Sequence, residues 1–385
     1  PPPTQAPPPR EPTPPRSEHG YDEQGKYRPT HDVPMDRSCQ ERFVAPRAGN
    51  TATDLNGVAL PDVCIHTNGP HRVFVIGDWG GIGVPPVPAD HRSKNYLHHR
   101  AFVVGADDRA QLNVAEQMRR RAEEADPDYI INVGDNFYWG GVDERCGTAP
   151  YDSTDSTGQW HYVFEQIYRG RGLDGKQWLG VLGNHDYGGF LFTSGWDRVI
   201  GYTWDQTAVS TGRWMTPAQY WQSKVVYPDF SVDYYFVDSN IFDAFPPDTD
   251  DMHNMCSRTH NTQNGVESCG AQGPMSVDDC PIWFQKLWDD QVKWLEKRLS
   301  ESTADWQIVV THFPPFHGQE TWIRLCQLYG IDLIITGHVH NQQVKYIDAD
   351  NPLQPTAYII SGGGGGITSE GLPSAVGEDD EYGFM

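Results

Sequence analysis

Five apolar runs of strand length dominate the hydrophobic pattern, and each is followed at once by a short polar segment. In chain order they are HRVFVIGDWGG, YIINVGDNFYWGG, WLGVLGNHDYGG, WQIVVTHFPPFHG and IDLIITGHVHN. Because their apolar residues occupy consecutive rather than alternating positions, the runs are typical of strands that are covered on both faces. The pattern therefore favours an α/β protein.

Helical patterns lie between the runs. Residues 109–126 and 288–302 carry apolar side chains near helical spacing, with charged residues at the other positions. A further strand pattern, SVDYYFVDSN, and a late pair, NQQVKYIDAD and TAYIISGGGGG, favour antiparallel neighbours. The fold class that we predict is α/β, with two mixed β-sheets packed face to face as a sandwich and flanked by helices.

The composition changes along the chain and predicts one main domain with appendages. Residues 1–16 are mostly proline, a composition that forms extended polyproline II and builds no core. Residues 243–283 show no periodicity and are long for a loop, which indicates an insertion near a functional edge. The predicted divisions are a Pro-rich low-complexity tail at 1–35, an irregular arm at 36–70, the main domain at 71–370 with its insertion, and an acidic, solvated tail at 371–385.

The chain is strongly acidic, with 52 Asp and Glu against 29 Lys and Arg, a net charge of −23. Such a charge repels nucleic acids and anionic membrane surfaces, so we expect neither as a partner. No stretch approaches 18 consecutive apolar residues, and we expect no membrane-spanning helix. We expect the Pro-rich arm to be available to extracellular partners.

Seven cysteines are present, at positions 39, 64, 146, 256, 269, 280 and 326. Three of them lie in the polar segment from 243 to 283, and a loop of that composition needs covalent support. We favour disulfides in a secreted or extracellular protein, or in a lysosome-like compartment, with one cysteine left over. The alternative is unpaired thiols in a reducing compartment.

The polar segments after the five runs carry side chains that can bind metal ions. In chain order they are Asp78, Asp135, Tyr138, Asn184, His185, His312, His338 and His340. Because strands in one open sheet deliver their carboxyl ends to a common edge, these side chains should converge there. Carboxylate, phenolate, amide and imidazole groups suffice for two ions that share a bridging carboxylate, which predicts a dinuclear hydrolytic site. Taken singly, most of these motifs are more often turns or packed residues.

The order D-x-G, G-D-x-x-Y, G-N-H-D, V-x-x-H and G-H-x-H resembles that of the purple acid phosphatases of the calcineurin-like metallophosphoesterase superfamily. GDWGG at 77–81 is most similar to the short, tartrate-resistant type, and the resemblance covers about residues 71–368. It implies an α/β/β/α metallophosphoesterase fold and a catalytic main domain. The implied metal ligands are Asp78, Tyr138 and His340 for one ion, Asn184, His312 and His338 for the other, and Asp135 as the bridge.

The resemblance further implies a ferric ion beside Tyr138 and a divalent ion of iron, zinc or manganese in the second position. The implied activity is that of an acid phosphatase, in which a metal-bound hydroxide attacks a small phosphate monoester. His185 is similar to the family's histidine that contacts phosphate and assists departure of the leaving group, and Asp186 is expected to orient it. His317 either supplies a second such group or only lines the cleft, because it lies closer to His312 than its counterpart in the short enzymes.

The glycine run SGGGGG at 361–366 follows the last apolar segment. It lacks the lysine of a phosphate-binding P-loop. Because glycine permits close approach of the backbone, we expect this run to pass near the metal loops, and it is similar to the small-residue SGxG stretch of the family.

Two alternatives fit the same motifs. The chain could be a non-catalytic structural or adhesive surface protein that retains the fold, with the Pro-rich arm and the insertion serving assembly. It could also be a phosphodiesterase or nucleotide hydrolase that uses the same site.

Overall fold

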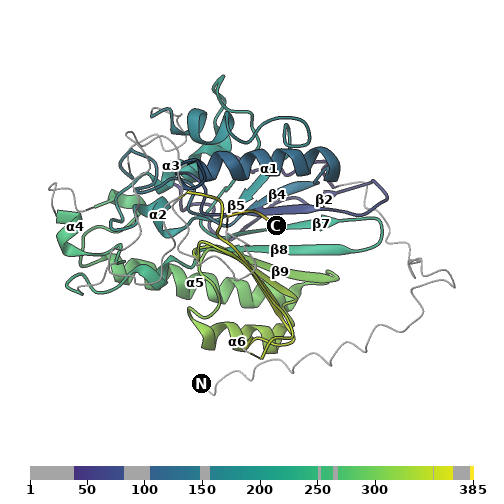
Figure 1. Cartoon of the computed structure of the whole chain (residues 1–385). Helices are drawn as coiled ribbons and strands as arrows, with labels where there is room; N and C mark the ends of the chain where they lie inside the picture. Colours follow the sequence, from purple (N-terminus) through teal and green to yellow (C-terminus); the bar gives the residue numbers. More distant parts are fainter. Residues whose placement is uncertain are drawn as a thin grey trace, which may run out of the picture.

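Two β-sheets packed face to face form the centre of the molecule, with α1 against one sheet and α5 and α6 against the other (Figure 1). The computed structural model describes residues 39–81, 105–147, 157–249, 253–262, 268–349, 351–366 and 382–385. The tail predicted at 1–35 and most of the one predicted at 371–385 lie outside these residues. The arrangement confirms the predicted α/β class with two sheets flanked by helices.

The strands are mostly short. They are β1 (Val58–Ala59), β2 (Val63–Cys64), β3 (Val73–Ile76), β4 (Tyr129–Asn132), β5 (Trp178–Gly180), β6 (Trp214–Met215), β7 (Trp221–Val226), β8 (Ser231–Val237), β9 (Trp306–Thr311), β10 (Leu333–Thr336), β11 (Gln342–Lys345) and β12 (Ala357–Ser361). All five apolar runs contain one of these strands.

The two predicted helices are present as α1 and α5, and α5 begins earlier than expected because Pro281 fits a first helical turn. The α-helices are α1 (Ala110–Ala125), α2 (Asn184–Tyr187), α3 (Trp196–Gly201), α4 (Arg258–Thr262), α5 (Cys280–Glu301) and α6 (Gln319–Tyr329). Within the described residues, one π-helix, η3 (Trp160–Glu165), and the 3-10 turns η2 (Asp107–Arg109), η4 (Tyr202–Trp204), η5 (Asn240–Asp243) and η6 (Gly270–Gln272) complete the helical elements. None of the described helices combines the length and the apolar character that crossing a bilayer requires.

The larger sheet is mixed and has the order β1-β7-β8-β9-β10-β12-β11, with β2 also paired to β7. Its strand β8 is antiparallel to β7 and parallel to β9, and β11 is antiparallel to β12. The smaller sheet has the order β3-β4-β5-β6, and its four strands all run parallel. The prediction that both sheets are mixed is therefore wrong for this sheet.

Alternation along the strands of the smaller sheet explains why they are apolar throughout. Val75 and Ile131 face the larger sheet, whereas Phe74, Ile76 and Ile130 face the layer that contains α1. Each strand therefore buries both faces, as parallel strands in α/β proteins do. At the outer face of the larger sheet, α5 and α6 cover β8, β9, β10 and β12.

Residues 39–70, for which an irregular arm was predicted, are partly regular. They contribute β1 and β2 to the edge of the larger sheet, and Phe43, Leu60 and Val63 are buried in the core between the sheets. This segment is therefore an integral part of the main fold.

Three disulfides confirm the interpretation of the cysteines, and Cys326 is the cysteine left over, buried and free. The pairs are Cys39–Cys64, Cys146–Cys269 and Cys256–Cys280. Two of them attach the insertion at 243–283, one to the loop after β4 and one to the start of α5.

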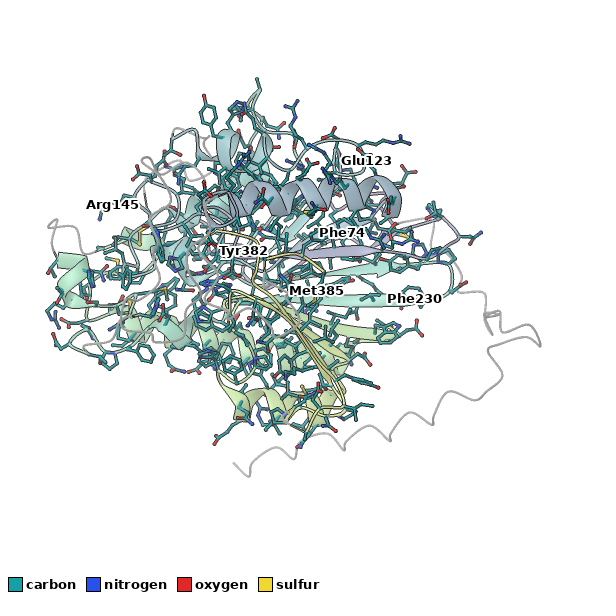
Figure 2. The ribbon with its side chains drawn as sticks, in the orientation of Figure 1. Phe74, Glu123, Arg145, Phe230, Tyr382 and Met385 are labelled. Atoms are coloured by element: carbon teal, nitrogen blue, oxygen red, sulfur yellow. A yellow bond between two sulfur atoms is a disulfide. The ribbon has the colours of Figure 1, made fainter. Side chains whose placement is uncertain are left out.

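The last described segment, residues 382–385, lies against the smaller sheet rather than in solvent, which corrects the prediction of a solvated tail for these residues (Figure 2). Met385 and Val75 exchange two backbone hydrogen bonds of 2.7 and 2.9 Å, the pattern of an antiparallel pair. The Phe384 ring packs 5.0 Å from that of Phe74, and the Tyr382 hydroxyl donates to Asp107 over 2.8 Å. The edge of β3 is thereby covered.

Candidate metal centre

The predicted metal ligands follow strands of both sheets. In the smaller sheet Asp78 follows β3, Asp135 follows β4 and Asn184 follows β5, and in the larger sheet His312 follows β9 and His338 follows β10. Hydrogen bonds join the two sets: His312 Nδ1 donates to the Val133 carbonyl over 2.7 Å, and the His338 amide donates to Asp78 over 3.0 Å. The convergence expected at the edge of one sheet therefore occurs between two sheets.

Three of the ligands, Asp78, Tyr138 and His340, form what we call the Tyr138 group. The Tyr138 hydroxyl lies 3.1 Å from Asp78 Oδ1 and 3.4 Å from His340 Nε2. His340 Nε2 lies 3.4 Å from the same Asp78 oxygen. The Tyr138 hydroxyl also contacts Asp135 Oδ2 at 2.9 Å. A carboxylate, a phenol and an imidazole thus present their polar atoms to one point.

Three others, Asn184, His312 and His338, form the His312 group. His312 Nε2 lies 3.1 Å from Asn184 Oδ1, and the His312 and His338 rings are 5.3 Å apart. His312 Nε2 also lies 3.4 Å from Asp135 Oδ2, the oxygen that contacts Tyr138. One carboxylate oxygen therefore joins the two groups, and all seven predicted ligands are brought together.

Three residues of the centre have a left-handed backbone conformation that is unusual for residues other than glycine. The φ angles are 58° at Asp78, 53° at Asp135 and 67° at His338. Each such residue costs on the order of 1 kcal/mol or more, so the surrounding structure must hold it in place. Strain of this kind concentrates at functional sites.

Burial and neighbouring charges move the pKa values of the acidic ligands. Burial raises the pKa of Asp78. Burial acts in the same direction on Asp135, but the imidazoles of His312 and His185 outweigh it and hold the Asp135 pKa well below its usual range. Burial, followed by the two carboxylates, raises the pKa of Tyr138 well above its ordinary value. A bound cation would oppose this effect by favouring the phenolate.

The pKa values of the two histidines of the His312 group are shifted in opposite directions. Burial favours neutral His312, but the Asp135 carboxylate overcomes it and raises the His312 pKa to about 10. Burial, aided by the charge of His312, lowers the pKa of His338 well below its usual value. His338 is therefore the neutral imidazole of the pair, the form that binds a metal ion.

His185 lies beside Tyr138, with ring centroids 4.5 Å apart. Its Nδ1 contacts the Trp139 carbonyl at 2.6 Å, so that carbonyl, and not Asp186 as predicted, orients the ring. Asp186 instead accepts hydrogen bonds from the Gly183 amide and from the amide and side chain of Asn136, each between 2.8 and 2.9 Å. Burial raises the Asp186 pKa to about 8, and its contacts brace the loops that carry the ligands.

His317 lies beside the His312 group, whereas His185 lies beside the Tyr138 group. The His317 ring lies 5.6 Å from that of His338 and 5.1 Å from that of Phe313, and its side chain is half-buried. Burial, followed by the charge of His312, lowers its pKa. The contact with His338 puts it at the edge of the centre.

The glycine run after β12 passes close to the centre, which confirms the expectation from its sequence. A Cβ atom added to Gly366 would lie 2.2 Å from Cε2 of Tyr138 and 2.7 Å from the Asp78 carbonyl oxygen. Only glycine allows this approach, so Gly366 holds the phenol ring against the strand ends.

Sequence reasoning missed Asn136 and the Trp139 carbonyl. The Asn136 side chain donates to Asp186 through Nδ2 and accepts from Asn132 Nδ2 over 2.5 Å, so it links those two residues. Both missed residues lie within the motif GDNFYWGG, but a backbone carbonyl carries no residue-type signal. Their roles depend on contacts with the loop after β5, far away in the sequence.

The donor set fits metal ions. Asp78, Asp135 and His312 each offer a ligand atom, and these atoms all lie within 4.8 Å of one another. Asn184 Oδ1, the atom of its side-chain amide that can bind a metal ion, lies 3.1 Å from His312 Nε2. Carboxylate and phenol oxygens suit a hard trivalent ion, and amide and imidazole donors suit a divalent one.

The chain is similar to known phosphoesterases. The family model of the calcineurin-like phosphoesterases matches residues 71–342. Tartrate-resistant acid phosphatase type 5 of Homo sapiens is 24% identical over 329 residues, which cover 80% of this chain and 78% of that protein. Purple acid phosphatase 17 of Arabidopsis thaliana is 27% identical over 307 residues, which cover 77% of this chain and 69% of that protein.

Among solved structures, the fold is similar to that of GAP50, the anchor in the inner membrane complex of Plasmodium. The TM-score is 0.46 at 17% sequence identity, and the match covers 76% of this chain and 72% of that one.

Proposed function

The chain belongs to the calcineurin-like phosphoesterase family, and from that premise we propose that it is a dinuclear-metal acid phosphatase acting on small phosphate monoesters. The observation that carries the proposal is that Asp135 Oδ2 contacts both Tyr138 and His312. A carboxylate placed between two separate donor groups could serve as a ligand shared by a pair of metal ions.

In this proposal the Tyr138 group holds a ferric ion, the His312 group holds a divalent ion of iron, zinc or manganese, and Asp135 bridges both. When bound, the two cations supply the charge that attracts phosphate oxygens and activates water. The protein supplies a buried, prearranged set of donors, so little reorganisation is needed on binding.

His185 is the proposed proton donor to the leaving oxygen. With Nδ1 donating to the Trp139 carbonyl, Nε2 is the nitrogen that gains and loses a proton. Burial, the largest influence, lowers the pKa of His185, which makes its protonated form a stronger acid. His317, beside His338, is the proposed second contact to the phosphate.

Three disulfides support an oxidising compartment, and we propose that the protein is secreted, extracellular or in a lysosome-like compartment. Interaction of the Pro-rich arm with extracellular partners is part of the same proposal. The net charge of −23 disfavours nucleic acid as a partner.

Metal analysis combined with a visible spectrum tests the proposal. We expect about two metal ions per chain, at least one of them iron, and a phenolate-to-iron absorption band that shifts or fades in Tyr138→Phe. Tyr162→Phe is the matched control, since that side chain is 62% exposed. The same preparation should release phosphate from an aryl phosphate between about pH 4 and 7.

A colourless protein with two zinc or manganese ions would retain hydrolysis but remove iron from the proposal. A protein that takes up no metal after reconstitution and releases no phosphate would contradict it and favour the structural alternative.

A further inference from the structure

Residues 382–385, which we call the edge segment, continue the smaller sheet beyond β3. Met385 exchanges its two backbone hydrogen bonds with Val75 of β3. The last two side chains point to opposite faces, because Phe384 packs on the core cluster that includes α1, and Met385 packs on the cluster between the sheets. Such alternation is that of a strand. The edge segment is therefore held on both faces and along its backbone.

The edge segment also reaches the glycine run at 361–366. The Gly383 amide donates to the Gly363 carbonyl over 2.7 Å. The Ser361 hydroxyl, at the start of the run, donates to the Val75 carbonyl over 3.0 Å. The glycine run is thus bonded both to the edge segment and to β3. Because its glycines carry no side chains, contacts of the backbone decide where the run lies.

The same run bonds to the loop that carries Asp78. The Gly364 amide donates to the Gly77 carbonyl over 3.0 Å, and the Gly366 amide donates to the Asp78 carbonyl over 2.7 Å. Gly366 is also the residue that lies against the Tyr138 ring. Two ligands of the Tyr138 group therefore depend on the position of the glycine run.

The support that the run receives is noncovalent. The three disulfides join other parts of the chain. Glycine loses more conformational freedom on folding than any other residue, so a run of five glycines is costly to hold in one conformation. Contacts with other segments must supply this order, and the edge segment provides one of them.

We propose that the edge segment positions the Tyr138 group by fixing the glycine run, and thereby sets how tightly that group holds its metal ion. The inference rests on the proposed function, in which this group binds a ferric ion. The segment acts through the backbone of the run, so its role is one of positioning. The His312 group is carried by the loops after β5, β9 and β10, and we expect the segment to affect it much less.

The affinity of the metal-loaded protein for iron tests the proposal. Phe384→Ala removes the ring that packs 5.0 Å from that of Phe74 and should loosen the edge segment. We expect the affinity for iron, measured by competition with a chelator, to fall about 10-fold, as when a residue that supports a metal ligand is lost. The visible band should shift, whereas the affinity for the divalent ion should stay at its wild-type value.

Two variants serve as controls. Phe384→Leu keeps the apolar bulk and should retain most of the wild-type affinity for iron. Phe230→Ala removes a half-buried ring of the same size just before β8, at the end of the sheet opposite to the centre, and should leave the affinity unchanged (Figure 2). An unchanged affinity in Phe384→Ala, the same fall in Phe230→Ala, or an equal fall for both ions would overturn the proposal.

Amide hydrogen exchange separates this inference from the proposed function, because it needs no metal. In the metal-free protein the Gly364 and Gly366 amides should exchange with solvent several-fold faster in Phe384→Ala than in the wild type. If no monoester is hydrolysed but exchange and iron affinity change as expected, the phosphatase function fails and the positioning role stands. Equal exchange rates in the two proteins, or a wild type that binds no iron, would overturn the inference whatever the turnover.

Discussion

The Tyr138 group and the His312 group are made of different chemistry although they share Asp135 and lie side by side. The first offers a carboxylate, a phenol and an imidazole, and the second offers an amide and two imidazoles. The pKa values of Asp78 and Tyr138 are raised, whereas that of His338 is lowered.

If the proposed pair of ions is bound, this difference would let one site distinguish between them. Binding at the Tyr138 group must displace a proton from a phenol whose pKa is high, which only a strongly charged cation does efficiently. In the other group the pKa of His338 is lowered and that of His312 is raised to about 10, so an ion bound there would displace a proton only from His312. The following predictions test that contrast in order of expected effect.

Asp135→Asn should have the largest effect, because it removes the charge that both groups share. We expect kcat/KM for a monoester to fall at least about 10³-fold, since both ions lose their common ligand. Asp143→Asn changes an exposed carboxylate further along the same loop and should leave turnover intact. Retained activity in Asp135→Asn would contradict a bridged pair of ions. If the wild type shows no activity and Asp135→Asn binds partners as well as the wild type does, the structural alternative is favoured.

His338→Gln should affect one group only. We expect about one metal ion per chain instead of about two, an unchanged visible band and a loss of kcat/KM of about 10²-fold. His66→Gln, at an exposed position, is the control for the substitution. Loss of the visible band in His338→Gln would show that the two groups do not bind metals independently.

Asp238 follows β8 behind the His312 group, and its titration should make the protein more stable in acid. Burial raises its pKa to about 6, so between about pH 6 and 4 the folded protein binds a proton that the unfolded chain does not. The free energy of unfolding should therefore rise as the pH falls through this range, by at most about 3 kcal/mol.

Asp238→Asn should remove this dependence. The amide oxygen can keep accepting from the backbone and side chain of Asn240, which now donate at 2.9 and 3.0 Å, but its NH2 group cannot accept from the Tyr187 hydroxyl, which now donates over 2.8 Å. Chemical denaturation at several pH values measures the effect, with exposed Asp229→Asn for comparison. The same pH slope in both variants would assign the effect to other groups.

His317→Gln should have the smallest effect. If His317 contacts the phosphate in the ground state and the transition state alike, KM should rise about 3- to 10-fold while kcat changes little. Steady-state kinetics between pH 4 and 7 would check this. A fall in kcat alone would instead make His317 a proton donor like His185.

Much of the centre could be predicted because its ligands are local in sequence. Asp78, Asp135, Asn184, His312 and His338 each come within a few residues of a strand end, and the strands are recognisable from their apolar runs. The assignment of the strands to two sheets was harder to predict, since the pattern that marks a buried strand does not name its neighbours.

Contacts between distant segments account for what the sequence did not reveal. Asp186 follows His185 directly, yet it bonds to Asn136 and Gly183, and His185 bonds to Trp139. The acidic composition near the end of the chain likewise predicted solvation, whereas Phe384 finds a partner in Phe74. Apolar packing of a few residues outweighs the average character of a segment.

The pairing of Val75 with Met385 also bears on how the protein folds during synthesis. β3 is an edge strand of the smaller sheet, and the backbone groups of Val75 are paired with those of Met385, which lies far along the chain from β3. Until the segment that contains Met385 leaves the ribosome, this edge remains open to other strands, including those of neighbouring nascent chains. Completion of the sheet therefore comes long after translation of β3 itself.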